Sequence, residues 1–168
     1  MIKSISILIV FFSVMSTCMA QDSLANLLKR YNTKHIPYIT VQELAMPKTN
    51  YKILDAREPD EYLVSHLKNA VFVGYKDFKI ETILNEIPNK NDTIVVYCSL
   101  GIRSETISKK IQDKGYTAVY NLYGGIFEWK NNDFPVYNKQ NKKTDSIHAF
   151  SKMWGKWLNK GVKVYDLN

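Results

Sequence analysis

A short apolar run, Ile94–Tyr97, ends directly on Cys98 and is followed by a helical pattern. An unbroken run rich in β-branched residues is typical of a buried strand. Ser104 is placed to cap the following helix, which ends at Gly115. The sequence therefore predicts a cysteine in a short loop between a strand and a helix N-terminus. Backbone N–H groups and the helix dipole favour negative charge at such a place, and so favour a thiolate.

The same alternation of strand and helix extends along much of the chain. Further strand-like segments occur at residues 35–39, 51–56, 70–73 and 117–122, and helical patterns at 40–46, 61–64 and 78–87 and after Gly125. This order predicts an α/β fold with a central parallel sheet and helices on both faces. Ligands of such sheets bind beyond the carboxyl ends of the strands, where both Asp55 and Cys98 are expected.

The first twenty residues have the pattern of an export signal. Lys3 precedes an apolar stretch over residues 5–14, and a small-x-small cleavage site ends at Ala20. We expect residues 1–20 to be removed and the protein to be exported, to the periplasm if the source is bacterial. The alternative is a lipoprotein, anchored to a membrane through a lipidated Cys18.

The remaining 148 positions divide by composition into three parts. Residues 21–34 are expected to form a lead-in with a short helix, and residues 35–137 a single α/β domain. Residues 138–168 are expected to form a polar linker over 138–144 and then a C-terminal helical extension.

The extension carries an apolar pattern at helical spacing. Ile147, Phe150, Trp154, Trp157 and Leu158 fall on one face of a helix, and lysines recur every four residues on the opposite face. Such a helix either packs back on the domain or contacts a protein partner, and the sequence leaves both open.

The net charge of +7 is basic, but much of it lies in lysine-rich surface segments. The chain carries no nucleic-acid-binding motif that would give the charge that purpose, so we expect no nucleic-acid partner. Attraction of small anions agrees with its sign.

Removal of residues 1–20 would leave Cys98 as the single cysteine, so no internal disulfide is possible. His35 and His148 have no neighbouring residues that suggest metal ligation, and we expect neither a metal nor a cofactor. Any covalent chemistry is expected to use the Cys98 thiol.

Several motifs together resemble the rhodanese family of sulfurtransferases. The loop 98–104 is similar to the active-site loop of that family, and residues 53–62 are similar to the segment after its early strand. Residues 65–70 match its Gly-His-Ile-Pro-Gly-Ala segment in part, and residues 124–136 resemble its closing segment. The resemblance spans about residues 36–136 and implies a rhodanese-like fold.

The resemblance also implies a reaction. The thiolate of Cys98 would take a sulfane sulfur from a small anion such as thiosulfate, or from a persulfide donor, and pass it to a thiol or to cyanide. The persulfide would be held by the backbone amides of the loop residues Ser99, Leu100, Gly101, Ile102, Arg103 and Ser104. Arg103 is expected to pair with a nearby carboxylate, and Asp55 and Arg57 to support the site.

Loop length separates this reaction from that of cysteine phosphatases. Those enzymes need Cys-x5-Arg to surround a tetrahedral phosphate, whereas Arg103 gives Cys-x4-Arg and Ser104 stands at the phosphatase position. The uncharged residues Ser99, Leu100 and Ile102 leave the donor open. His66 is expected to support a turn. A catalytically weak module that binds a partner or senses redox state is the alternative function.

Overall fold

The computed structural model describes residues 23–33, 35–47 and 50–166, and the statements below refer to these residues. The predicted export signal at residues 1–20, and with it Cys18, lies outside the described residues. Within them, no helix has the length and apolar character needed to cross a membrane.

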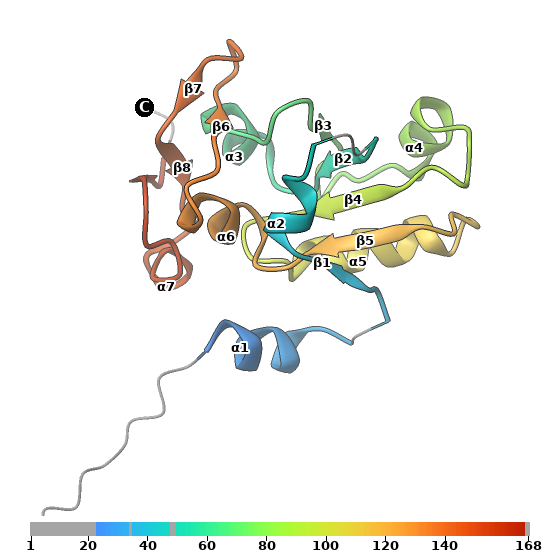
Figure 1. Ribbon diagram of the computed structural model, residues 1–168, viewed down its shortest axis with the longest axis horizontal. Coiled ribbons are helices and arrows are strands. Elements are labelled where there is room, and N and C mark those ends of the chain that lie inside the picture. The colour runs from blue at the N-terminus through green and yellow to red at the C-terminus, as the bar shows by residue number, and fades with distance from the viewer. Residues whose placement is uncertain (1–22, 34, 48–49, 167–168) are drawn as a thin grey trace, which may run out of the picture.

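A five-stranded parallel sheet forms the centre of the molecule (Figure 1). Its strands are β1 (Tyr38–Ile39), β2 (Lys52–Asp55), β3 (Val71–Phe72), β4 (Ile94–Tyr97) and β5 (Val119–Leu122). Their spatial order is β1-β5-β4-β2-β3, which places β4 in the middle. The parallel pairing confirms the α/β class that the alternating sequence pattern predicts.

Strand β4 is buried on both faces of the sheet. Val95 and Tyr97 pack in one hydrophobic cluster, and Ile94 and Val96 pack in the other. All four residues are 0% exposed. A strand with two buried faces has to be apolar at every position, which explains why the run is unbroken.

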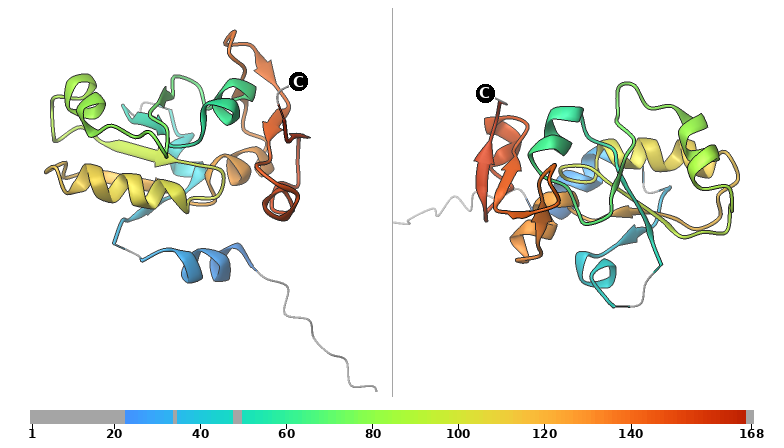
Figure 2. Two further views of the ribbon diagram at one scale, coloured as in Figure 1. Left: turned by 180° about the vertical axis from the view of Figure 1, so that it is seen from behind. Right: turned by 90° about the horizontal axis from the view of Figure 1, so that it is seen from above.

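Helices cover both faces of the sheet. The helices of the described chain are α1 (Leu24–Tyr31), α2 (Val41–Leu44), α3 (Pro59–Val64), α4 (Ile80–Glu86), α5 (Arg103–Gln112), α6 (Gly125–Asn131) and α7 (Lys152–Gly155). Ile83 of α4 and Ile107 of α5 belong to one cluster, and Leu44 of α2 and Ile126 of α6 to the other. The view from above in Figure 2 accordingly has these two helix pairs on opposite sides of the strands.

The ends of two short helices follow from their sequence. The hydroxyl of Ser23 accepts a hydrogen bond from the Asn26 N–H at 3.2 Å and begins the lead-in helix α1. Thr40 and Glu43 form the predicted capping box at α2, because each side chain accepts from the backbone N–H of the other, at 3.2 and 2.8 Å.

The predicted N-cap of α5 is wrong. The helix begins at Arg103 with Ile102 as its N-cap, two residues earlier than expected. Ser104 is fully buried, and its hydroxyl donates to the side-chain oxygen of Asn121 at 2.7 Å. A tertiary contact that local sequence cannot reveal therefore engages the hydroxyl in place of the cap.

The expected polar linker is a β-hairpin. Strand β6 (Val136–Tyr137) pairs antiparallel with β7 (Lys143–Thr144). The side chain of Asn138 accepts from the N–H groups of Gln140 and Lys142 at 3.0 and 3.1 Å. Asn141 adopts a φ of +56°, which asparagine tolerates better than most residues. The asparagines that suggested a linker therefore build a turn.

The C-terminal extension also differs from the expected long helix. Residues Ser146–His148 form β8, which pairs in parallel with β9 (Val162–Val164), and helix α7 between them has 4 residues. Phe150 has a φ of +64°, which no right-handed helix can accommodate. Ser151 then begins α7 by accepting from the Trp154 N–H. The apolar spacing of a helix is here produced by a strand, a turn and a short helix in succession.

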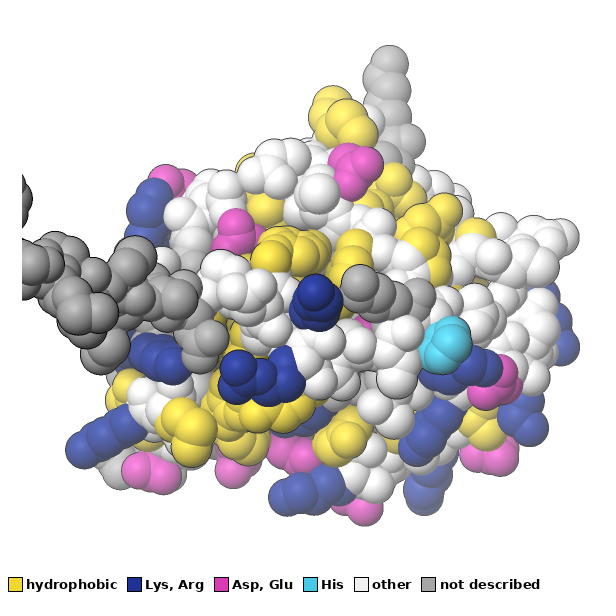
Figure 3. Space-filling model, turned by 90° about the horizontal axis from the view of Figure 1, so that it is seen from below, with side chains coloured by type: hydrophobic (Ala, Val, Ile, Leu, Met, Phe, Trp, Pro, Cys, Tyr) yellow, Lys and Arg dark blue, Asp and Glu magenta, His cyan; other side chains and the backbone are white. Residues whose placement is uncertain are grey.

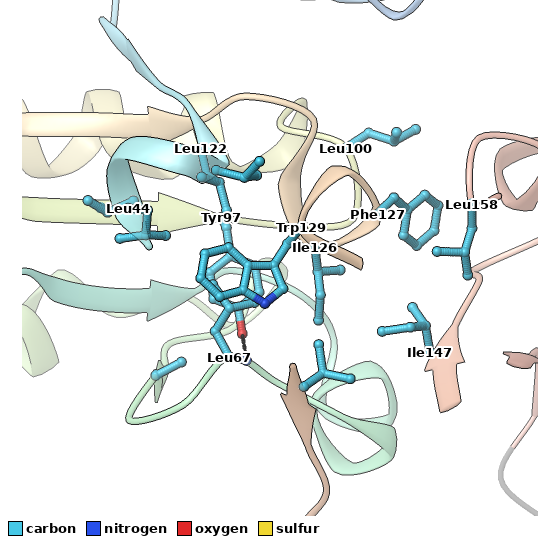
Figure 4. Packing of buried hydrophobic residues seen from close by; sticks show 14 of the residues in the cluster. Leu44, Leu67, Tyr97, Leu100, Leu122, Ile126, Phe127, Trp129, Ile147 and Leu158 are labelled. Atoms are coloured by element: carbon cyan, nitrogen blue, oxygen red, sulfur yellow. Dashed lines mark hydrogen bonds between the residues drawn. The ribbon is translucent and has the colours of Figure 1, made fainter. Parts of the chain in front are cut away.

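The extension packs back on the domain. Ile147, Ala149 and Leu158 are 0% exposed and belong to the same cluster as Phe127 of α6. Figure 4 shows Ile147 and Leu158 pointing toward the Phe127 ring. Of the two interpretations of the extension, packing on the domain is the one observed, while contact with a protein partner stays a prediction.

The basic charge is dispersed on the face seen in Figure 3. Lysine and arginine side chains are scattered there among apolar and acidic ones. This distribution agrees with the interpretation of the +7 net charge as a solvated surface.

Candidate active site

Strand β4 delivers Cys98 to the carboxyl edge of the sheet. The residue is 2% exposed and begins the loop that leads into α5. Parallel pairing places Asp55, the last residue of β2, beside Tyr97. The two positions that the sequence analysis placed at strand ends are therefore neighbours in space.

Two polar groups of the loop lie close to the sulfur of Cys98. The Gly101 N–H donates to Sγ at 3.2 Å, and the Ser104 hydroxyl lies 3.5 Å from it. Gly101 has a φ of +95°, and a Cβ there would stand 3.0 Å from the backbone oxygen of Leu122. Glycine is therefore required for the loop to curl around the sulfur.

The loop favours the thiolate. Burial raises the pKa of the Cys98 thiol, whereas the positive charge of Arg103 and hydrogen bonds from Ser104 and Leu100 lower it. The net result is a pKa below the ordinary value of 9.0. A lowered thiol pKa is what a nucleophilic cysteine needs near neutral pH.

Asn121 of β5 holds the loop from below, and the sequence analysis did not identify it. Its amide nitrogen donates to the Gly101 backbone oxygen at 2.8 Å, and its oxygen accepts from the Ser104 hydroxyl at 2.7 Å. The residue is 0% exposed. Its one sequence signal is a polar side chain inside the otherwise apolar strand 119–122, and such a residue needs partners when buried.

Helix α6 closes the loop from the other side. The N–H groups of Ile126 and Phe127 donate to the backbone oxygens of Cys98 and Ser99 at 2.9 and 3.1 Å. A Cβ on Gly125 would stand 2.2 Å from the Cys98 oxygen, so the close approach requires glycine. The glycines at residues 124–125 thus serve the Cys98 loop as well as their own turn.

The carboxylate expected to pair with Arg103 is Glu61 of α3. The guanidinium nitrogens lie 2.7 and 2.7 Å from its two oxygens, a bidentate pair. The Ser99 hydroxyl donates to the same carboxylate at 2.8 Å, and Glu61 is 1% exposed. Burial raises the pKa of Glu61, but hydrogen bonds and charge from Arg103 outweigh it and bring the pKa to about 2. Glu61 therefore fixes one side of the loop as a charged group.

Asp55 and Arg57 form a separate, fully buried ion pair. The guanidinium donates to the carboxylate at 2.9 and 2.6 Å and to the Ser65 backbone oxygen at 2.6 Å. The Tyr97 hydroxyl donates to Asp55 at 2.5 Å and accepts from the Leu67 N–H at 3.1 Å. These contacts join β2 and β4 to the segment after α3, so the pair supports the backbone that leads into the Cys98 loop.

Backbone and ring contacts hold His66 in place. The backbone of His66 pairs with that of Tyr137 at 2.8 and 2.9 Å, and its ring packs against Tyr62, in agreement with a turn-supporting role. Burial lowers the pKa of His66, which favours the neutral ring. Within the described residues, no group of three or more histidine, cysteine, aspartate or glutamate side chains is arranged to hold a metal ion.

A cavity of about 210 Å³ opens above Cys98. The predicted loop residues that line it with the cysteine are Ser99, Leu100, Ile102 and Arg103. Gly101 and Ser104 contact the sulfur from behind. Two further lining residues, Phe150 and Trp154, come from the C-terminal extension, and the sequence analysis placed them only on a helix face.

Comparison with known proteins agrees with this geometry. A family model described as "Rhodanese-like domain" matches residues 40–132. The thiosulfate sulfurtransferase PspE of Escherichia coli is 37% identical over 71 residues, which are 42% of this chain and 67% of the relative. The thiosulfate sulfurtransferase GlpE of Coxiella burnetii is 31% identical over 97 residues, 58% of this chain and 87% of the relative.

Other matches cover less of the relative or are more distant in sequence. The chain is 32% identical to the senescence-associated protein DIN1 of Raphanus sativus over 110 residues, and it spans 59% of that protein's length. The crystal structure of a thiosulfate sulfurtransferase from Pseudomonas aeruginosa superposes with a TM-score of 0.58 at 20% identity, covering 74% of this chain and 24% of that one. That likeness shows a shared fold. With more than half of its length matched, the chain belongs to the family of rhodanese-like domain proteins.

Proposed function

We propose that this chain is a sulfurtransferase that carries a sulfane sulfur on Cys98. The observation that carries the proposal is the cysteine itself: its sulfur accepts the Gly101 N–H at 3.2 Å, faces a cavity, and has a lowered thiol pKa. Relatives named thiosulfate sulfurtransferase support the same type of reaction.

The proposed reaction has two displacement steps. In the first, the Cys98 thiolate attacks the sulfane sulfur of a donor such as thiosulfate, and a new S–S bond forms as the donor's S–S bond breaks. The bonding electron pair leaves with the rest of the donor, which for thiosulfate is sulfite. In the second step a thiolate or cyanide attacks the outer sulfur, and the electron pair of that S–S bond returns to Cys98.

The loop is suited to the intermediate between the two steps. The outer sulfur of a persulfide carries negative charge, and α5, a helix of 10 residues, begins at Arg103 directly after the loop. Its N-terminus supplies a partial positive charge to the region that the sulfur would occupy. Because Asn121 and α6 already hold the loop backbone, little reorganisation is needed when the charge arrives.

Intact-mass measurement tests the proposal. Purified protein exposed to thiosulfate should gain the mass of one sulfur atom and lose it again on addition of cyanide, with release of thiocyanate. Cys98→Ser is the matched control, since it keeps the size of the side chain and removes the nucleophile. A protein that gains no sulfur from any sulfane-sulfur donor offered, or a Cys98→Ser variant that gains it equally, contradicts the proposal.

We also propose that the protein is exported. The support is the charged, apolar and small-residue pattern over residues 1–20. Fractionation of cells that express the full chain should place the processed protein outside the cytoplasm, with an N-terminus at Gln21. A lipid-modified N-terminus at Cys18 would favour the lipoprotein alternative, and an unprocessed protein in the cytoplasm would contradict both.

A further inference from the structure

The outer wall of the Cys98 cavity comes from outside the family match. Phe150 and Trp154 line the cavity opposite the Cys98 loop, and both lie beyond residues 40–132. The wall is therefore a feature of this chain that the shared family segment does not contain. A substrate bound at Cys98 would contact this wall, so the wall bears on which sulfur donor the site accepts. The following inference rests on the proposed function and specifies its donor.

Phe150 is held in a strained conformation over the cavity. Among the described non-glycine residues with positive φ, the others are asparagine or aspartate, whereas Phe150 is bulky and has a φ of +64°. The residue is 47% exposed, so burial does not compensate for the strain. The ring lies 4.9 Å from the Arg103 guanidinium carbon, in a cation–π contact. Strain of this kind is concentrated at residues that a functional site holds in place.

Trp154 is held from two sides. Its backbone N–H is bonded to the Ser151 side chain at the start of α7, at 3.4 Å. Its ring packs edge-on against Tyr31 of α1, with 5.8 Å between the ring centroids. The lead-in and the extension thus fix an aromatic wall before any ligand enters.

The size and lining of the cavity suit an apolar group next to sulfur. Its volume of about 210 Å³ exceeds the roughly 150 Å³ of an apolar cavity that binds benzene. Leu100, Ile102, Phe150 and Trp154 supply an apolar lining, which thiosulfate has no group to contact. An aromatic ring attached to the reacting sulfur would pack against the two aromatic side chains.

The charges at the cavity disfavour a dianion. Arg103 is the one charged residue among the described residues that line it. Its charge is already matched by the bidentate pair with Glu61, and the Cys98 thiolate adds a further negative charge. A donor with one negative charge is therefore repelled less than thiosulfate, which carries two.

We propose that Phe150 and Trp154 make the Cys98 site selective for sulfur donors that carry an aromatic group and a single negative charge, with aryl thiosulfonates as the model class. The thiolate would attack the sulfane sulfur of Ar–SO2–S⁻ and form Cys98–S–S⁻. The S–S bond of the donor breaks, and its electron pair leaves with the aryl sulfinate, Ar–SO2⁻. One negative charge enters with the donor and one leaves with the sulfinate, so the step is balanced without a further reactant.

Steady-state kinetics with two matched donors tests this inference. Thiocyanate formation from cyanide is measured with benzenethiosulfonate and with methanethiosulfonate, which carry a phenyl and a methyl group on the same thiosulfonate. Each kcat/KM is divided by the rate constant for the reaction of free cysteine with the same donor. This division removes the difference in intrinsic reactivity between the two donors from the comparison. We expect the aromatic donor to be preferred roughly tenfold in the wild-type protein, the value of a good aromatic contact.

Variants then locate the preference. Phe150→Gly removes the ring and relieves the strained backbone, so its fold should survive, and Trp154→Ala removes the second ring. Each should reduce the donor preference by about threefold or more. Met153→Ala is the matched control, because Met153 lies on the same helix, is 68% exposed and is not among the cavity-lining residues; its preference should equal that of the wild type.

The possible results separate the two proposals. Equal use of the two donors by the wild-type protein, or a preference that both ring variants retain, overturns the inference while sulfur transfer stands. Absence of thiocyanate with every donor, together with absence of a sulfur adduct in the mass measurement, overturns the proposed function itself.

Discussion

Replacement of Glu61 by glutamine tests whether a charged carboxylate holds the Cys98 loop. The substitution keeps the shape of the side chain but removes the charge that faces Arg103 at 2.7 and 2.7 Å. The pKa of Glu61 is lowered from 4.5 to about 2, which corresponds to about 3 kcal/mol of stabilisation of the folded state at pH 7. Breaking a buried ion pair from one side costs a similar roughly 3–5 kcal/mol.

The pH dependence distinguishes this charge effect from a packing defect. A carboxyl with a lowered pKa contributes stability above its unfolded-state pKa, and the contribution is lost as the pH falls toward its folded-state pKa. The difference between wild-type protein and Glu61→Gln in free energy of unfolding should therefore fall from about 3 kcal/mol at pH 7 to about 1.5 kcal/mol at pH 3. Urea denaturation at pH 7, 5, 4 and 3 measures it.

Asp60→Asn is the matched control for Glu61→Gln. Asp60 lies on the same helix and in its first turn, but its side chain is exposed, so its loss should cost less than about 1 kcal/mol. A difference between Glu61→Gln and wild-type protein that stays constant from pH 7 to pH 3, or that is no larger than the control's, would refute the reasoning.

Three further substitutions, one of them with a control variant, test other parts of the site. Gly125→Ala should lower the free energy of unfolding by more than about 2 kcal/mol, measured by thermal unfolding, because its Cβ would stand 2.2 Å from the Cys98 oxygen. Gly74→Ala is the control: its Cβ would meet nothing closer than 3.5 Å, so it should lower the free energy of unfolding by about 1 kcal/mol. Equal losses in the two variants would contradict the close approach at Gly125. Tyr97→Phe should destabilise by about 1–3 kcal/mol in urea, since it leaves a buried N–H without its acceptor, and an unchanged midpoint would contradict this. The rate of Cys98 alkylation by iodoacetamide should reach half its maximum below pH 9.0 in the wild-type protein and at higher pH in Arg103→Gln, and an unmoved midpoint would remove Arg103 as a cause of the lowered pKa.

The sequence was sufficient where a structural rule is local. The unbroken run Ile94–Tyr97 predicts a buried strand because both of its faces need apolar side chains. Thr40 and Glu43 predict a capping box because the two residues, three positions apart, bond to each other. The parallel sheet follows from the order of such elements along the chain.

The sequence was insufficient where a side chain has a distant partner. Ser104 has the chemistry of an N-cap, but Asn121, from another strand, binds its hydroxyl. Glu61 stands 42 positions from Arg103, so the sequence could indicate a carboxylate partner without identifying it. The aromatic spacing of the extension fits a helix, yet the positive φ of Phe150 interrupts that helix. No local sequence pattern predicts this positive φ.

These long-range contacts separate the role of the residues in the family match from that of the C-terminal extension. Within the residues of the family match, Arg103 is paired with Glu61, so its guanidinium acts mainly as a clamp on the loop and is less available to bind a free anion. In the proposed reaction, stabilisation of the persulfide would depend on the loop around Cys98, which Asn121 and α6 hold in place beforehand. A loop that binds the single outer sulfur of a persulfide does not distinguish between the donors from which that sulfur came. In the proposed selectivity, discrimination would come from the surface that contacts the rest of the donor, and Phe150 of the extension lines the cavity above Cys98 where that part of the donor would lie.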